Sequence, residues 1–323
     1  MKFLFIGDIH IRGNNPRNRL DDYKEACKTK LRECFKIAVE NKVTAILQSG
    51  DIFHSPEVSI ATLLDFVEVF KECPVPIYCT VGNHDVFGYN LETYGRTSLQ
   101  LLQLLVQNFN VAAGNARDTV IGDGKSKTDV WVSFQPYTSQ VDTNGFGYMS
   151  SVGSFEPVIH MVHGMLLDHN LPYEAKYTNL YNVETDADII LSGHDHIGYG
   201  VIKRHDGKLF CNPGALMRIN ASTAEISRPI QVALINTEKM DIQLIPLKCA
   251  KPGEEVLDRS QIEENDARQY AMEEFSALIK TDTGTAVLNI PDIVEQIAKQ
   301  EQLTKNVVDK AIELLGGVKS EKV

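Results

Sequence analysis

The first half of the chain alternates short apolar runs with longer amphipathic segments. Three runs are short, apolar and rich in β-prone residues, namely 2–6, 43–48 and 75–81. Three segments carry apolar residues at helical spacing, namely 21–41, 57–71 and 98–107. The resulting β-α-β-α-β order predicts a largely parallel sheet with crossover helices.

The pattern changes after Val111, where short strand-like runs follow one another without long helices. The candidate strands are 130–134, 158–162, 188–191, 199–202 and 208–211, and 231–235 with 241–247 form a closing hairpin. These strands predict a second sheet that packs against the first.

The tripeptide Lys251-Pro252-Gly253 predicts a domain boundary, with one domain at 1–250 and a second region at 251–323. Apolar stripes in the second region predict three helices, at 261–280, 291–300 and 304–315, which either dock a partner or cap the first domain. This region carries a net charge of −6 out of the total of −11 for the 323 residues, so the first domain is closer to neutral. The acidic total argues against a broad basic surface for nucleic acid.

Composition narrows the class of protein further. No apolar run approaches the roughly 18 residues of a membrane span, and the amino-terminal run is too short for a signal peptide. The six cysteines lack CxxC spacing, which favours free thiols in a reducing compartment over a disulfide framework. We therefore expect a cytoplasmic protein that does not bind membranes.

Five short motifs each follow a predicted strand. They are Asp8-Ile9-His10, GDIFH ending at His54, GNHD ending at Asp85, His163-Gly164 and GHDH ending at His196. In open α/β sheets ligands collect beyond the carboxyl ends of the strands, so folding should bring the motifs to one rim. Carboxylates, imidazoles and an Asn carbonyl without thiolate predict a site for Mn, Fe or Zn rather than for Ca or a structural zinc cage.

Together these motifs resemble those of the calcineurin-like metallophosphoesterases over about residues 1–215. The resemblance implies a four-layer α-β-β-α sandwich, here with a small C-terminal helical extension, that binds two divalent ions. We expect Mn, with Mg, Fe or Zn as alternatives. The implied ligands of one ion are Asp8, His10, Asp51 and His196. The implied ligands of the other are the bridging Asp51, Asn83, His163 and His194. His84 would approach the scissile phosphate, and Asp85 would either fix the tautomer of His84 or serve as a turn residue.

His54 sharpens this interpretation, because GDIFH with GNHD and a helical extension resembles the SbcD-type DNA repair nucleases. That resemblance implies a metal-dependent DNA exonuclease or endonuclease that acts in repair, recombination or end processing. It also implies an SbcC-like coiled-coil ATPase partner docked on the C-terminal helices, and a homodimer formed through the segments 57–71 and 98–107. His54 would orient the scissile phosphate or its neighbour.

Three arginines after His10 are candidate contacts to DNA phosphates, namely Arg12, Arg17 and Arg19. Two other functions compete with the nuclease. One is a small-substrate metallophosphodiesterase or phosphatase that uses the same metal site. The other is a non-catalytic scaffold for an ATPase, against which the complete set of ligands argues.

Overall fold

The computed structural model describes residues 1–114, 119–121, 129–150, 157–260 and 305. Residues Met1–Arg259 form one compact unit. The three helices predicted beyond residue 260 lie outside the described residues, so the helical extension and the domain boundary at 250 stay predictions. Residues that follow this boundary still pack on the unit, since the backbone N–H of Leu20 donates to Val256 O at 3.1 Å.

The first sheet has six strands in the order β14-β13-β1-β2-β3-β4. Its parallel strands are β1 (Lys2–Ile6), β2 (Ala45–Gln48), β3 (Ile77–Thr80) and β4 (Phe109–Ala112). The predicted closing hairpin, β13 (Gln231–Asn236) and β14 (Asp241–Pro246), pairs antiparallel with β1. The hairpin thus extends the first sheet and does not belong to the second.

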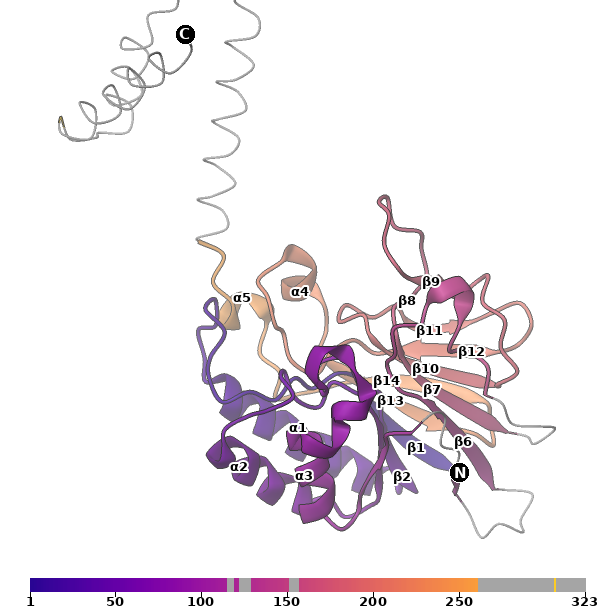
Figure 1. Cartoon of the computed structure of the whole chain (residues 1–323), viewed down its shortest axis with the longest axis horizontal. Helices are drawn as coiled ribbons and strands as arrows, with labels where there is room; N and C mark the ends of the chain where they lie inside the picture. The colour runs from indigo at the N-terminus through magenta and orange to yellow at the C-terminus, as the bar shows by residue number, and fades with distance from the viewer. Residues whose placement is uncertain (115–118, 122–128, 151–156, 261–304, 306–323) are drawn as a thin grey trace, which may run out of the picture. The chain divides into compact units, whose positions relative to one another are not determined.

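Three helices cover the outer face of the first sheet (Figure 1). They are α1 (Tyr23–Glu40), α2 (Ile60–Lys71) and α3 (Ser98–Leu105). Each begins at a residue whose side chain accepts a backbone N–H of the first turn, namely Asp22, Ser59 and Thr97. All three helices match segments predicted from helical spacing, and their ends differ from the predicted ones by at most three residues.

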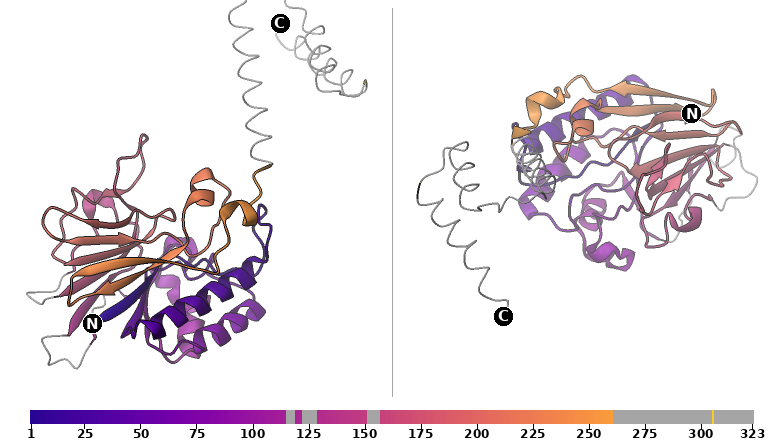
Figure 2. Two further views of the ribbon diagram at one scale, coloured as in Figure 1. Left: turned by 180° about the vertical axis from the view of Figure 1, so that it is seen from behind. Right: turned by 90° about the horizontal axis from the view of Figure 1, so that it is seen from above.

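The second sheet lies against the inner face of the first (Figure 2). Its order is β11-β12-β10-β7-β6-β5. The strands are β5 (Thr119–Ile121), β6 (Val130–Gln135), β7 (Val158–Gly164), β10 (Ile189–His194), β11 (Gly200–Lys203) and β12 (Leu209–Asn212). Alternation along β1 builds the layers, because Phe3 and Phe5 pack between the sheets whereas Leu4 and Ile6 face the helices.

The outer face of the second sheet carries its own apolar cluster, which includes Tyr148, Val162, Ile190 and Phe210. In the described part of the chain this layer contains loops, the short η3 (Thr143–Gly145) and a two-stranded sheet of β8 (Leu166–Leu167) and β9 (Thr178–Asn179). The remaining short elements are η1 (Phe87–Tyr89), η2 (Leu91–Arg96), α4 (Thr223–Ser227) and α5 (Gly253–Val256). The predicted fold class, a layered α/β protein with two central sheets, is confirmed.

Within the described residues, no helix combines the length and the apolar character that a bilayer span requires. The cytoplasmic location stays a prediction.

Candidate metal centre

The carboxyl ends of five strands bring the five motifs to one rim. Asp8 and His10 follow β1, Asp51 follows β2, and Asn83 follows β3. His163 lies near the end of β7, and β10 ends at His194. The side chains gather in the described structure into groups whose ligand atoms lie within 4.8 Å of one another. The fold therefore brings the five motifs together, as expected.

Three of the clustered residues adopt a backbone conformation that L-residues rarely use. The φ angle is 55° at His10, 53° at Asp51 and 79° at His194. Such left-handed conformations cost of order 1–3 kcal/mol at each non-glycine residue, and they gather at functional sites. The turns after β1, β2 and β10 thus store strain that aims the three side chains inward.

Two of the motif glycines are needed for space and not for a left-handed turn. A Cβ at Gly82 would collide with the carboxylate of Asp51, and one at Gly193 would collide with Asp8 and with Ser49. Neither glycine has a positive φ. Gly82 and Gly193 thus leave room for a carboxylate, and His194, next to Gly193, makes the left-handed turn. Gly50 differs, because its own φ is 97°.

The first group contains Asp8, His10, Asp51 and His196. The Nε2 atoms of His10 and His196 lie 3.0 Å apart. His10 Nε2 is 3.6 Å from Asp51 Oδ2, and His196 Nε2 is 3.6 Å from Asp8 Oδ2. These are the four residues that the resemblance assigned to one ion.

The second group contains Asp51, His163 and His194. His163 Nε2 lies 3.4 Å from Asp51 Oδ2 and 2.9 Å from Asn83 Oδ1, so Asn83 adjoins the group. The Nδ1 of His163 bonds to the carbonyl oxygen of Ser49 at 2.7 Å, which leaves Nε2 to act as a ligand atom. Asp51 is the one residue common to both groups.

The donor set fits divalent cations. Asp51 Oδ2 is buried without a hydrogen-bond partner, although it lies between His10 and His163. Burial lowers the pKa of His194 to about 3 and that of His196 to about 4, which leaves both imidazoles neutral near pH 7, as ligation requires. Burial, opposed by His163 and assisted by Asp51, raises the pKa of Asp8 to about 7. A bound cation would supply the positive charge that holds both carboxylates ionised.

A third group of imidazoles adjoins the first two and consists of His10, His54 and His84. The rings of His54 and His84 are stacked, with their centroids 5.2 Å apart. His84 Nδ1 lies 2.9 Å from the carbonyl oxygen of His54, so Nδ1–H donates to it and Nε2 remains for a ligand. Burial, reinforced by Arg12, lowers the pKa of His54 to about 4, which keeps this imidazole neutral near pH 7.

The family described as calcineurin-like phosphoesterase matches residues 1–198, which is more than half of the chain. The chain belongs to the calcineurin-like phosphoesterase family. Metal-dependent hydrolysis of phosphoesters is the activity that this membership implies, and the clustered side chains are the candidate site for it.

One protein with a similar sequence is the DNA double-strand break repair protein Mre11 of Methanococcus maripaludis. It is 30% identical over 89 residues, which are 27% of this chain and 23% of that protein. The match therefore spans about a quarter of the relative.

Two solved structures are similar to this chain. A dimetal phosphatase from Danio rerio is 14% identical with a TM-score of 0.42, and the similarity covers 76% of this chain and 98% of that one. The phosphoesterase Yfce from E. coli is 14% identical with a TM-score of 0.36, covering 77% and 100%.

The structure separates the three arginines that were grouped by sequence. Arg12 and Arg17 lie on the loop after His10, with Arg12 partly and Arg17 fully exposed. Arg19 is buried, pairs with Asp21 and donates to the carbonyl oxygen of Arg218. Its guanidinium is used inside the fold, so Arg19 does not extend the phosphate-binding surface expected of this loop.

Asp85 does not hold the tautomer of His84, which the carbonyl group of His54 sets instead. Its carboxylate accepts the backbone N–H groups of Asp51 at 2.8 Å, Gly82 at 2.9 Å and Phe53 at 3.0 Å. The last residue of GNHD thus ties its own turn to the GDIFH turn. The role as a turn residue, one of the two alternatives for Asp85, is the one that the geometry favours.

Two tyrosines next to the ligands carry no motif. The hydroxyl of Tyr23, in the first turn of α1, donates to the carbonyl oxygen of His10 at 2.9 Å. The ring of Tyr137 lies against His163 and His194, with centroids 6.2 and 5.8 Å away. Tyr23 lies in a predicted helix, and Tyr137 follows the predicted strand 130–134 without a metal-ligand residue beside it. Neither tyrosine therefore belongs to a ligand motif that the sequence analysis could detect.

Proposed function

We propose that the chain is a metal-dependent DNA nuclease that acts in DNA repair, recombination or end processing. The observation that carries the proposal is the pair of stacked imidazoles, His54 and His84, at the edge of the metal centre. The similarity to the Methanococcus maripaludis DNA double-strand break repair protein supports DNA as the substrate.

The ligand groups define how the reaction would run. Asp8, His10, Asp51 and His196 would hold one divalent ion, and Asp51, Asn83, His163 and His194 the other. When bound, such ions supply Lewis-acid polarisation of the phosphate and neutralise its charge. They would therefore replace a broad basic surface, which agrees with a chain of net charge −11.

The two imidazoles outside the ligand groups would act on the substrate itself. With its Nδ1–H held by the carbonyl group of His54, His84 can exchange a proton with the leaving oxygen only through Nε2. Neutral His54 stacks on it and would hydrogen-bond an oxygen of the phosphate that flanks the scissile one. Hydrolysis would then consume one water and leave a phosphomonoester and a free hydroxyl.

The nuclease is tested with linear duplex DNA and a small chromogenic diester, each assayed with Mn, Mg and Zn. We expect release of nucleotides with Mn to exceed diester turnover. His54→Asn should lower DNA cleavage at least tenfold more than diester turnover, because the small diester lacks the flanking phosphate. The matched control is His169→Asn, which alters an exposed imidazole.

The competing function is hydrolysis of small phosphoesters. The burial of Arg19 favours it, because only Arg12 and Arg17 remain on the candidate DNA-binding loop. Two results together would support the small substrate. Diester turnover would equal or exceed DNA cleavage, and His54→Asn would affect both substrates equally.

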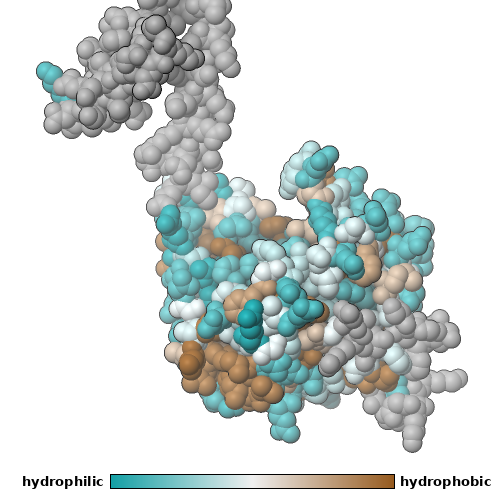
Figure 3. Space-filling model, in the orientation of Figure 1, coloured by the Kyte–Doolittle hydropathy of each residue, from teal (hydrophilic) through white to brown (hydrophobic). Residues whose placement is uncertain are grey.

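An exposed apolar surface on α2 and α3 supports a homodimer. Figure 3 shows this surface, and its residues are Ile60, Leu64, Leu101, Leu104 and Leu105. Ile60 and Leu64 are 76% and 52% exposed, whereas Leu63 of the same helix is buried. Burying such a patch against a second copy is favourable, since large exposed apolar patches mark interaction sites. Leu104→Glu should reduce the mass in light scattering to that of one chain, whereas Tyr173→Glu, on another exposed loop, should not.

Docking of an SbcC-like ATPase on the segment beyond residue 260 completes the proposal. Truncation after Arg259 retains the whole compact unit, including α5. We expect the shortened chain to cleave single-stranded DNA with the metal but to lose ATPase binding and ATP-stimulated digestion of duplex DNA. Unchanged ATPase affinity in a pull-down would show that this segment does not dock the partner.

A further inference from the structure

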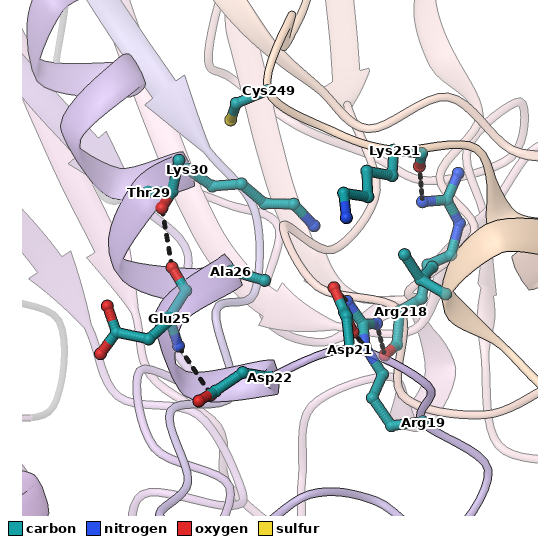
Figure 4. Close-up of a pocket in the computed structure, with 11 residues that line it drawn as sticks. Arg19, Asp21, Asp22, Glu25, Ala26, Thr29, Lys30, Arg218, Cys249 and Lys251 are labelled. Carbon is teal, nitrogen blue, oxygen red and sulfur yellow. Dashed lines mark hydrogen bonds and ion pairs between the residues drawn. The ribbon is translucent and has the colours of Figure 1, made fainter.

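A polar cavity of about 250 Å³ lies outside the metal centre, between the start of α1 and the residues Arg218, Cys249 and Lys251. Figure 4 shows its lining. The cationic side chains around it are Arg19, Lys30, Arg218 and Lys251. The site is built into the fold, because Glu33 of α1 accepts the backbone N–H groups of Lys248 and Cys249 and so fixes the wall opposite the helix.

Lys30 is buried, with 4% of its surface exposed, and it has no carboxylate partner in the described structure. Its Nζ donates to the carbonyl oxygen of Leu216 at 3.0 Å and meets Met217 Sδ at 3.4 Å, and an ammonium has three protons to donate. Burial, followed by the charge of Arg19, lowers the pKa of Lys30 to about 8. A buried ammonium without a counter-ion is costly, and an anion in the cavity would remove this cost.

Arg218 adds a second buried positive charge. Its guanidinium donates to three carbonyl oxygens, those of Glu225 at 2.7 Å, Arg228 at 2.8 Å and Lys251 at 3.1 Å. These bonds fix its position, but neutral carbonyl groups do not cancel its charge, and the nearby carboxylates of Glu225 and Glu254 do not line the cavity. Lys251 and Lys30 extend toward one another across the cavity (Figure 4). Two ammonium groups directed at one space attract an anion between them.

The carboxylates at the rim are engaged by other groups. Asp21 pairs with Arg19, and Asp22 accepts the backbone N–H of Glu25 as the N-cap of α1. Glu25 pairs with Lys28 at 2.8 Å, and its carboxylate is turned away from the cavity in Figure 4. Asp22 keeps its negative charge, because its partner is a neutral N–H, so four cationic and three anionic side chains line the cavity. In the described structure Lys30, Arg218 and Lys251 form no ion pair with any of these three carboxylates.

We propose that this cavity binds a phosphate group, either as inorganic phosphate or as the terminus of a phosphomonoester. Two lysine ammonium groups can donate directly to its oxygens, and Arg218 supplies a fixed positive field. The site is separate from the metal centre. Segment 215–217 lies between them, and the backbone N–H of Leu216 donates to the carbonyl oxygen of Asp8 at 2.7 Å. The proposal holds whether or not the chain cleaves DNA.

The test is calorimetric titration of the full-length chain with inorganic phosphate, first loaded with metal and then in excess chelator. We expect saturable binding that persists in chelator. Lys30→Met should raise the dissociation constant at least about tenfold, as expected for loss of a charge-assisted hydrogen bond. Lys36→Met, which alters a 74% exposed lysine of the same helix, should leave it unchanged.

The exposed Lys251 gives an independent variant, because Lys251→Met has no buried contact to lose, and it should also weaken binding. Binding that disappears in chelator, or that is equal in wild type, Lys30→Met and Lys251→Met, would overturn the proposal. A parallel titration with a deoxynucleoside 5′-monophosphate separates the sources. Tighter binding than that of phosphate identifies a phosphomonoester site, and equal or weaker binding identifies a site for free phosphate.

Discussion

Tyr23 links the helix layer to the metal centre, and its hydroxyl can be removed without changing the shape of the core. Tyr23 is 1% exposed, and burial raises the pKa of its hydroxyl, which therefore stays a neutral donor. It donates to the carbonyl oxygen of His10, whose φ of 55° already strains that turn. Tyr23→Phe should release the turn while the ring remains packed.

The expected magnitude follows from this single bond. Losing a buried hydrogen bond that leaves the carbonyl oxygen unpaired costs about 1–2 kcal/mol of unfolding free energy. Loss of an outer group that orients a metal ligand typically costs 10–100-fold in metal affinity. Tyr23 acts through the backbone of His10, so we expect about tenfold for one of the two ions.

The matched control is Tyr148→Phe. The hydroxyl of Tyr148 is equally buried and donates to Asp142 at 2.5 Å, but it contacts no metal ligand. Urea unfolding of both variants and calorimetric titration with Mn²⁺ separate the two effects. Both variants should lose similar stability, and only Tyr23→Phe should lose metal affinity. Two ions bound to Tyr23→Phe with wild-type affinity would show that the hydroxyl does not position His10.

Three further predictions concern the turns, the proton transfer and a buried charge. His84→Ser should keep both ions but lose about 10²–10⁴-fold in turnover, and turnover near the wild-type rate would rule out His84 as the acid. Gly82→Ala should lower metal affinity and destabilise the fold by about 1–3 kcal/mol because its Cβ would meet Asp51, whereas Gly95→Ala, with open space around it, should do neither. The pKa of Lys30 is lowered from 10.5 to about 8, so the unfolded chain binds more protons between these values. Wild-type stability should therefore rise with pH across this window relative to that of Lys30→Met, and parallel urea-unfolding profiles would contradict the assignment.

The strand ends and their motifs could be predicted because both are local properties. β1 has the predicted bounds, and all seven proposed ligands, from Asp8 to His196, meet at the predicted rim. A few neighbouring positions are enough to recognise a strand of alternating or apolar residues that is followed by a turn with glycine or Asp. Parallel pairing of β1, β2 and β3 then forces the turns together, whatever the rest of the chain does.

The residues that the sequence misplaced depend on neighbours far along the chain. Arg19 lies in a polar loop typical of a surface, yet it is buried against segment 218, about 200 residues later. Tyr23 reads as an ordinary helix residue until α1 packs across the carbonyl group of His10. The apolar spacing of α2 predicts a buried stripe, but it cannot separate Leu63, which faces the sheet, from the exposed Ile60 and Leu64. Such differences are decided by packing between layers, to which periodicity along one helix is insensitive.

The sharing of Asp51 between two ions is tested most directly by elemental analysis of the purified chain and of Asp51→Ala. Asp51 Oδ2 lies between His10 and His163, so this one carboxylate belongs to both groups. We expect two divalent ions per wild-type chain, and loss of both ions together with all phosphodiesterase activity in Asp51→Ala. Two tightly bound ions retained in Asp51→Ala would contradict the shared metal centre.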